Sequence, residues 1–319
     1  MSLGSVAGFA LVFVVCAWAL SSIGGLVLHR SRRWLQRQGP MAERRAAEAV
    51  AVVPVVLAAV AVATLVLQSA LGVDHCEAHD HHAHLCITHG AAWLERTSAM
   101  VTLAVAGAAM LVRLVLLVTS FARGARSIRE LHALSRDAGD VRIVDSDRPF
   151  CFVAGPTRPA IYVSSRVWSA LSEAERSALV AHERAHVRHG DLYLRVALEV
   201  FLVAAAPLVG DRVRAMWLHA GERLCDAHAA TVTGEPANVA SAMVALCRLN
   251  TSRPVASLGF TPTADELAGR VQAVLEGRPT GHRTAARLGR AVLTASLIVV
   301  GATIVASEPL HHVFETLLG

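Results

Sequence analysis

Four long apolar runs divide the chain, at residues 4–28, 49–71, 98–121 and 288–306. The first two contain no charged side chain, and the other two contain one arginine each. About 20 apolar residues in a helix match the hydrocarbon thickness of a bilayer. The pattern therefore predicts four transmembrane helices and a multi-pass protein of the cell membrane.

A fifth apolar run, residues 192–209, has a different character. It contains Arg195 and Glu199, which lie one helical turn apart. Two charges in hydrocarbon are unfavourable, so we expect a buried or interfacial helix here rather than a fifth span.

The segment between the third and fourth long runs has the pattern of an α+β domain. Short β-type stretches at 141–144, 150–153 and 160–163 are separated by Asp, Ser, Pro and Gly residues. These stretches predict a small sheet, and residues 135–140 are expected to form a loop.

Two helices are predicted after this sheet. Ser172 and Glu175 have the spacing of a capping box, which opens a helix, and Gly190 is expected to end it. A second helical run covers residues 213–233 and is closed by Gly234.

Arginine is distributed unevenly around the apolar runs. Six arginines lie between residues 29 and 45 and three at 123–129, whereas the connector 72–97 contains one. Because basic residues accumulate on the cytoplasmic side, this distribution predicts the orientation of the chain. We expect residues 1–121 to form three spans (4–28, 49–71, 98–121) with an external loop at 72–97. Residues 122–287 should be cytoplasmic, and residues 288–319 should form the last span and a short external tail.

The basic charge does not indicate a nucleic-acid-binding protein. All 30 basic residues are arginine, the net charge is +5, and many arginines flank the spans, where anionic lipid headgroups explain them. The absence of lysine excludes a phosphate-binding P-loop and a serine–lysine acyl enzyme.

The predicted external loop is unusually rich in histidine. Residues 74–90 contain six of the 16 histidines together with Cys76 and Cys86. The histidines could bind Zn or Cu, or the loop could be a solvated connector closed by a disulfide. Both interpretations stay open.

The chemistry of the chain is concentrated in two short motifs. His182-Glu183-Arg184-Ala185-His186 places two imidazoles on one face of a helix, and Glu222 and Asp226 lie one turn apart on the later helix. Two histidines and a glutamate, with a fourth position open, are the ligands of a hydrolytic zinc site. Glu183 would lie beside the metal as the base, and Asp226 could orient a ligand histidine. The alternative is a solvated helix whose histidines bind nothing.

The stretch from Phe152 to Asp226 resembles the BlaR/MecR family of membrane metallopeptidases. The resemblance rests on four pieces in order: GPTRPAIYVS at 155–164, LSEAERSALVAHERAHVRHGD at 171–191, an apolar helix ending near Pro207, and ERLCD at 222–226. It implies an α-rich membrane protein whose gluzincin-like zinc peptidase domain is inserted between the third and fourth spans.

The same resemblance implies residue roles. His182, His186 and Glu222 correspond to zinc ligands, Glu183 to the general base and Asp226 to a residue behind the ligands. The best-known members carry an external β-lactam sensor domain, which we do not expect in this lysine-free chain. HtpX-like membrane peptidases share both motifs and are the close competitor.

We expect a zinc endopeptidase that acts on a cytoplasmic or membrane-proximal protein, with a BlaI-like repressor as a candidate substrate. The alternatives are an HtpX-like quality-control peptidase and a non-enzymatic metal sensor that uses the external histidines. His219 and His228 are candidate donors to the oxyanion, or ordinary surface histidines.

The orientation is testable with reporter fusions. Fusions after Gln38 and Leu134 should report a cytoplasmic position and a fusion at Gly90 an external one, because arginines flank the spans asymmetrically. Alkaline phosphatase and fluorescent-protein fusions provide the two complementary readouts. An external signal at Leu134 would contradict the predicted topology.

Overall fold

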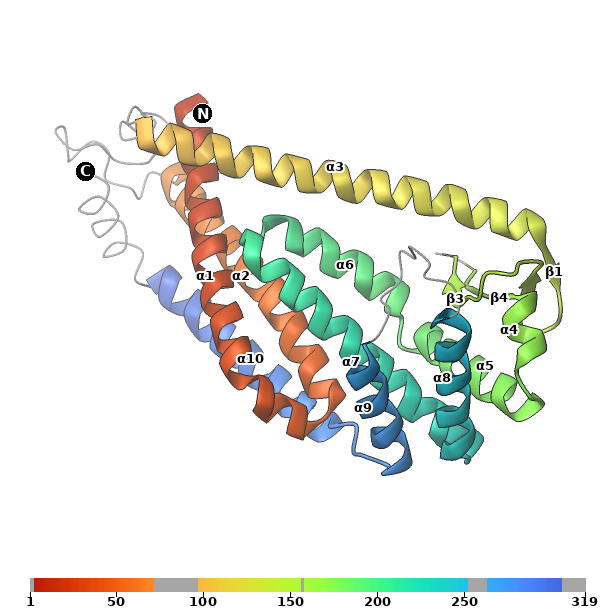
Figure 1. Ribbon diagram of the computed structural model, residues 1–319. Helices are drawn as coiled ribbons and strands as arrows, with labels where there is room; N and C mark the ends of the chain where they lie inside the picture. Colours follow the sequence, from red (N-terminus) through yellow and green to blue (C-terminus); the bar gives the residue numbers. More distant parts are fainter. Residues whose placement is uncertain (1–2, 72–96, 156–157, 252–262, 306–319) are drawn as a thin grey trace, which may run out of the picture.

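Four long apolar helices are candidate membrane spans (Figure 1). The computed structural model describes residues 3–71, 97–155, 158–251 and 263–305. Within these residues, four helices are long and apolar enough to cross a membrane. They are α1 (Leu3–Gln38), α2 (Pro40–Ala70), α3 (Thr97–Leu134) and α10 (His282–Val305). The histidine-rich segment 74–90 and the expected tail after residue 305 lie outside the described residues.

The first two helices meet at a turn that requires glycine. Gly39 has a φ of 105°, and a Cβ there would lie 2.6 Å from the carbonyl oxygen of Pro279. Only glycine adopts this conformation without strain while letting another backbone approach so closely. The turn therefore ends α1 beyond its apolar run, starts α2 at Pro40, and brings the segment before α10 against both helices.

A small sheet follows α3 in the chain. Its strand order is β1-β2-β4-β3, with β2 and β4 parallel and both outer pairs antiparallel. The strands are β1 (Ser135–Asp137), β2 (Arg142–Val144), β3 (Cys151–Ala154) and β4 (Ala160–Ser164).

The three predicted strands are confirmed, but the expected loop at 135–140 is wrong in part. Ser135–Asp137 form β1, because Gly139, with a φ of 79°, closes a tight hairpin onto β2. The Nε of Arg142 also donates to the Oγ of Ser135 over 2.8 Å.

Six helices follow the sheet in the chain. They are α4 (Ser165–Ala170), α5 (Glu173–Arg188), α6 (Asp191–Ala204), α7 (Pro207–Thr233), α8 (Pro236–Thr251) and α9 (Ala264–Leu275). The capping box of Ser172 and Glu175 is present at the start of α5, as predicted. Gly190 adopts the left-handed conformation directly after α5, which separates it from α6.

The fifth apolar run is not one helix. Its helix α6 ends at Ala204, and Pro207 starts α7 earlier than the predicted residue 213. Proline fits the first turn of a helix but cannot continue one, which accounts for the break. Ser21 of α1 satisfies the freed backbone, since its Oγ accepts from the N–H of Ala206 over 3.0 Å.

A shared apolar core joins the membrane helices to α6 and α7. Leu28 and Leu35 of α1 pack there with Ala47 of α2, Leu202 of α6 and Trp217 of α7. The candidate site is built on α5 and α7, so this core fixes it relative to the membrane part.

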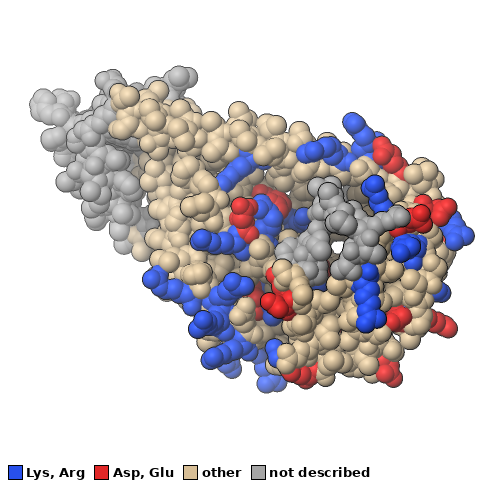
Figure 2. Space-filling model, in the orientation of Figure 1, with Lys and Arg blue, Asp and Glu red and all other residues tan. Residues whose placement is uncertain are grey.

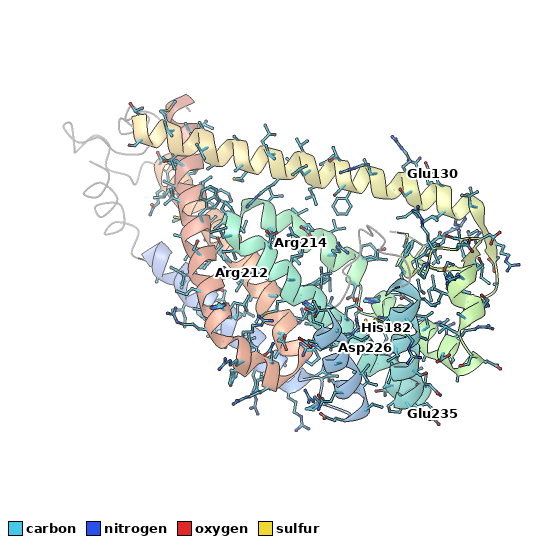
Figure 3. The ribbon with its side chains drawn as sticks, in the orientation of Figure 1. Glu130, His182, Arg212, Arg214, Asp226 and Glu235 are labelled. Carbon is cyan, nitrogen blue, oxygen red and sulfur yellow. The ribbon has the colours of Figure 1, made fainter. Side chains whose placement is uncertain are left out.

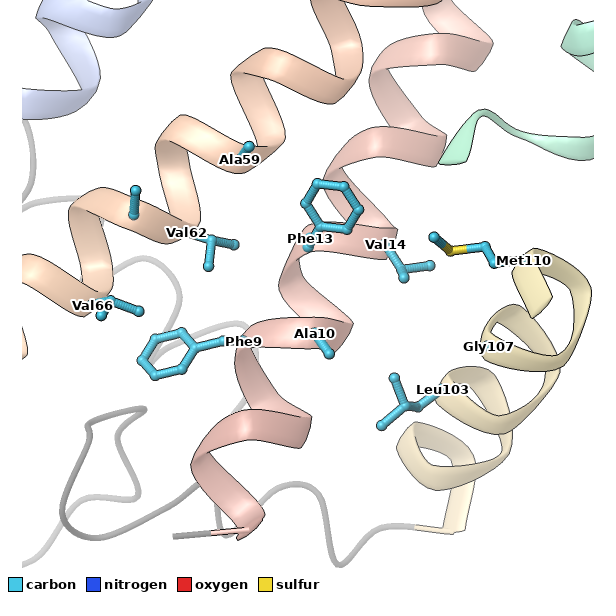
Figure 4. Close-up of a pocket in the computed structure, with 11 residues that line it drawn as sticks. Phe9, Ala10, Phe13, Val14, Ala59, Val62, Val66, Leu103, Gly107 and Met110 are labelled. Atoms are coloured by element: carbon cyan, nitrogen blue, oxygen red, sulfur yellow. The ribbon is translucent and has the colours of Figure 1, made fainter. Parts of the chain in front are cut away.

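In contrast, α3 packs sparsely along its length (Figure 1). Its Arg113 donates to the carbonyl oxygen of Ala205 over 2.6 Å, at the end of α6. An apolar pocket of about 640 Å³ opens between α1, α2 and α3, lined by Phe9, Phe13 and Met110 among others (Figure 4). Such a surface suits contact with lipid acyl chains.

The packing of α2 against the later helices predicts a large effect of one arginine. Arg44 is buried and its Nη2 lies 2.6 Å from Oδ1 of Asp191, the first residue of α6. Arg44→Met should lower the free energy of unfolding by about 3–5 kcal/mol, because it removes the cation of a buried ion pair and leaves Oδ1 of Asp191 without its partner. Denaturant unfolding in detergent measures the change.

The neighbouring arginine provides the control. The side chain of Arg45 is 55% exposed, so Arg45→Met should change the free energy by about 1 kcal/mol or less. Equal effects of the two substitutions would show that the buried pair is not what stabilises this contact.

Candidate metal centre

The two motif histidines meet Glu222 where α5 packs against α7. His182 and His186 lie one turn apart on α5, with ring centroids separated by 5.0 Å. The Nε2 of His182 is 3.7 Å from Oε2 of Glu222, and the Nε2 of His186 is 3.6 Å from Oε1. The structure therefore brings the three predicted ligands to one point, near the His182 and Asp226 labels in Figure 3.

These separations fit a zinc ion. Ligand atoms about 2.0–2.2 Å from a tetrahedral zinc lie about 3.4 Å from one another, close to the observed distances. The three residues form one of two groups of metal-binding side chains found among the described residues. Two imidazole nitrogens and a carboxylate are also the donor set that zinc favours at hydrolytic sites.

Each histidine is oriented by a carboxylate on its other nitrogen. The Nδ1 of His182 lies 3.0 Å from Oδ1 of Asp226, and the Nδ1 of His186 lies 2.7 Å from Oδ2 of Asp191. A carboxylate accepts a hydrogen bond from Nδ1–H, which leaves Nε2 as the free acceptor. Both Nε2 atoms point at Glu222, so both rings present the nitrogen that a metal would use.

The sequence pointed to Asp226 but assigned no role to Asp191. Asp191 follows Gly190, and the change of direction at this glycine turns it back toward His186. The sequence feature that could have indicated this role is the position of Asp191 directly after Gly190, at the start of a new helix. Its partner Arg44 lies 147 positions away and had no signal at all.

The electrostatics around His182 favour a positive charge. Burial alone would lower the pKa of His182, but its hydrogen bond to Asp226 and the nearby carboxylates raise that pKa to about 9. Asp226 stays ionised despite its burial, because Arg270 and His182 hold its pKa below the usual range. The carboxylates that stabilise a charged imidazole here would equally stabilise a bound cation.

Glu183 is buried beside His182, His186 and Glu222. It is 7% exposed, and burial raises its pKa against the opposing charges of His182 and His186. The thiol of Cys151, on β3, hydrogen-bonds to it. Burial raises the pKa of Cys151 well above the normal thiol value, so the thiol keeps the proton that it donates.

Arg270 of α9 is a further residue that the sequence did not reveal. Its Nε and Nη2 donate to the two oxygens of Asp226 over 2.7 and 2.8 Å. Its Nη2 also lies 3.1 Å from Oε2 of Glu222. This fork holds the carboxylate behind His182 and contacts the third candidate ligand as well.

The other histidine and cysteine candidates lie in different surroundings. The Nε2 of His219 is 3.1 Å from Glu266, and the ring of His228 packs edge-on against His189. These contacts give no support to either as an oxyanion donor. Cys225 is buried with its Sγ 3.4 Å from Nδ1 of His186.

The family comparison agrees with this geometry. The family model of the BlaR1 peptidase M56 matches residues 74–232, which include α5 and nearly all of α7. The chain is similar to BlaR1-type membrane peptidases. It is also 29% identical to the Protease HtpX homolog of Acidiphilium cryptum (strain JF-5), over 37% of this chain and 55% of that relative.

The chain thus spans about half the length of the curated relative that it matches. No solved structure matches it significantly. The two resemblances seen in the sequence are confirmed, and together they support a membrane metallopeptidase.

The carboxylate behind His182 can be tested directly. Asp226→Asn should weaken zinc binding by about 10–100-fold, because the amide no longer fixes the ring through an ionic hydrogen bond. Competition with a chromophoric chelator measures the affinity. Asp211→Asn, whose side chain is 91% exposed on the same helix, should leave the affinity unchanged. Equal affinities for wild type and Asp226→Asn would show that Asp226 does not orient a ligand.

Proposed function

We propose that the chain is a membrane-embedded, zinc-dependent endopeptidase whose metal ligands are His182, His186 and Glu222. The observation that carries the proposal is the convergence of two Nε2 atoms on the Glu222 carboxylate, with Glu183 buried alongside. The matches to a peptidase family and to a protease homologue support hydrolysis of peptide bonds as the reaction.

In this proposal, different residues of the chain have different roles in peptide hydrolysis. A bound zinc ion would supply Lewis acidity and ease the ionisation of the attacking water. Glu183 accepts the proton of that water as it attacks the peptide carbonyl, and passes the proton to the leaving amine. Burial raises the pKa of Glu183 in the direction that suits a general base near neutral pH. Cys151 helps to keep the carboxyl in place, and Asp226 and Asp191 hold the two imidazoles.

The small sheet supports a polypeptide as the substrate. Among the described residues, β3 pairs with β4 alone, and its Cys151 contacts Glu183. An extended peptide can add to such an edge through main-chain hydrogen bonds, which depend little on its side chains. The edge thus lies beside the proposed general base.

The substrate, in this proposal, is a cytoplasmic or membrane-proximal protein, and a BlaI-like repressor is the specific candidate. The choice of a repressor as the candidate substrate rests on the BlaR1-type match and on a cytoplasmic placement of residues 122–287, which the arginine distribution predicts. The alternative, an HtpX-like quality-control peptidase, would instead act on unfolded membrane proteins. Incubating the purified protein with each class of substrate separates the two, since cleavage of unfolded membrane proteins alone would exclude the repressor.

A non-enzymatic metal sensor is the remaining alternative. It would use the histidines of residues 74–90, which lie outside the described residues. Deleting that segment would then abolish every response, while changes at Glu183 would have no effect.

The decisive experiment uses Glu183→Gln. This substitution keeps the size of the side chain and removes its basicity, so zinc content should stay near one per chain while peptide cleavage falls about a hundredfold or more. Metal analysis and a fluorogenic casein assay on detergent-purified protein give the two readouts.

Two variants make this result interpretable. The double variant His182→Ala, His186→Ala should lose both zinc and cleavage, because it removes two of three ligands. Glu173→Gln, at the exposed start of α5, should retain both. Wild-type cleavage by zinc-loaded Glu183→Gln would rule out Glu183 as the base.

A further inference from the structure

A large cavity lies behind the candidate metal centre. It measures about 990 Å³ and is enclosed by the carboxyl-terminal half of α1, the start of α2, and helices α7 and α9. Asp226 and Arg270 form part of its wall, whereas the three candidate zinc ligands do not line it. The cavity is therefore a neighbour of the metal centre and not the same site.

The charge of this cavity is strongly positive. Seven arginines and three carboxylates line it. The carboxylates are already paired, since Glu43 contacts Arg223, Glu266 contacts His219, and Asp226 contacts Arg270. Two of these partners are arginines, and the third is a histidine whose pKa is lowered by burial.

Four of the lining arginines have no carboxylate partner in the described part of the chain. They are Arg32, Arg33 and Arg37 of α1, and Arg212 of α7. Figure 2 shows blue side chains gathered over the lower end of α1, and Figure 3 labels Arg212 higher up, beside the middle of α1. All four side chains are exposed, so they present positive charge at this surface, and a bound anion would reduce the repulsion between them.

His219 reports the same field from inside the cavity. Burial lowers the pKa of His219, and the charges of Arg223, Arg270 and Arg32 lower it further, against the pull of Glu266. The charge of Arg32, which has no carboxylate partner among the described residues, therefore acts on a histidine of the cavity wall.

The cavity also has an apolar end. Gly25 and Leu28 line it at the last residues of the apolar run of α1, opposite Val209, Val213 and Met216 of α7. The arginines of α1 follow directly after Leu28 in the sequence. The cavity therefore crosses from the apolar part of a candidate span to its basic flank.

An occupant must match both ends. A free phosphate would satisfy the arginines and leave the apolar end unfilled, and an acyl chain alone would leave the arginines unpaired. A phospholipid with an anionic headgroup meets both requirements, and basic pockets at the ends of membrane helices bind such headgroups.

We propose that this cavity binds one phospholipid with an anionic headgroup, held by Arg32, Arg33 and Arg212. The lipid lies with its headgroup among the arginines and its acyl chains toward Leu28 and Val209. This site is independent of the proposed peptidase activity, because binding can be measured without turnover.

The test is a lipid titration of the delipidated, full-length protein in detergent, followed by native mass spectrometry. The probes are phosphatidylglycerol, phosphatidylcholine and inorganic phosphate. Wild-type protein should bind one phosphatidylglycerol at least tenfold more tightly than phosphatidylcholine. The triple variant Arg32→Gln, Arg33→Gln, Arg212→Gln should lose at least tenfold in that affinity, since each basic side chain near an anionic lipid contributes roughly fivefold.

A matched variant removes the same charge elsewhere. Arg123, Arg126 and Arg129 are exposed on α3 and lie outside the cavity lining, so their joint change to Gln should alter the affinity less than twofold. The single variant Arg212→Gln, at an exposed position, should show an intermediate loss and guards against misfolding of the triple variant.

Three results would overturn the proposal. Equal loss in the α3 variant would indicate a general surface effect. Displacement of the lipid by millimolar phosphate would indicate a free-anion site, and equal binding of phosphatidylcholine would show that the arginines do not select the headgroup.

Discussion

The buried ion pair between Arg44 and Asp191 is the contact on which the arrangement of this molecule depends. Arg44 belongs to the membrane helix α2, stacks 4.5 Å from the ring of Trp217 on α7, and bonds to the carboxylate that orients His186. Two charges are buried together only when their geometry is satisfied. The pair therefore fixes the membrane helices, α7 and one candidate metal ligand relative to one another.

The second ligand is held in the same way by a different part of the chain. His186 is backed by Asp191 and then Arg44, whereas His182 is backed by Asp226 and then Arg270. One arginine comes from α2 and the other from α9, on either side of the motifs in sequence. Each imidazole is thus the end of a chain of charge-assisted hydrogen bonds. The candidate centre therefore uses contacts from α2, before the motifs, and from α9, after them.

These connections relate the metal centre to the membrane. Arg270 holds Asp226 and contacts Glu222, and it also lines the basic cavity beside α1. The wall of the cavity and the surroundings of the candidate metal centre therefore share Asp226 and Arg270. Apolar side chains of α1, α2, α6 and α7 also pack into one core. This core joins α7, which carries Glu222, to the candidate membrane helices α1 and α2.

The sequence by itself determined the four candidate spans, most of the sheet, the start of α5 and the helical spacing of His182, Glu183 and His186, because each depends on local periodicity or capping. The convergence of Glu222 on both histidines was expected from the motifs, and the tertiary structure supplied its geometry. Only the fold decided the roles of Asp191, Arg44, Arg270 and Cys151. Arg44 lies 147 positions from Asp191 and Arg270 lies 44 positions from Asp226, so no local pattern encodes these contacts. Asp191 is only five positions from His186, but the change of direction at Gly190 that brings the two side chains together belongs to the fold.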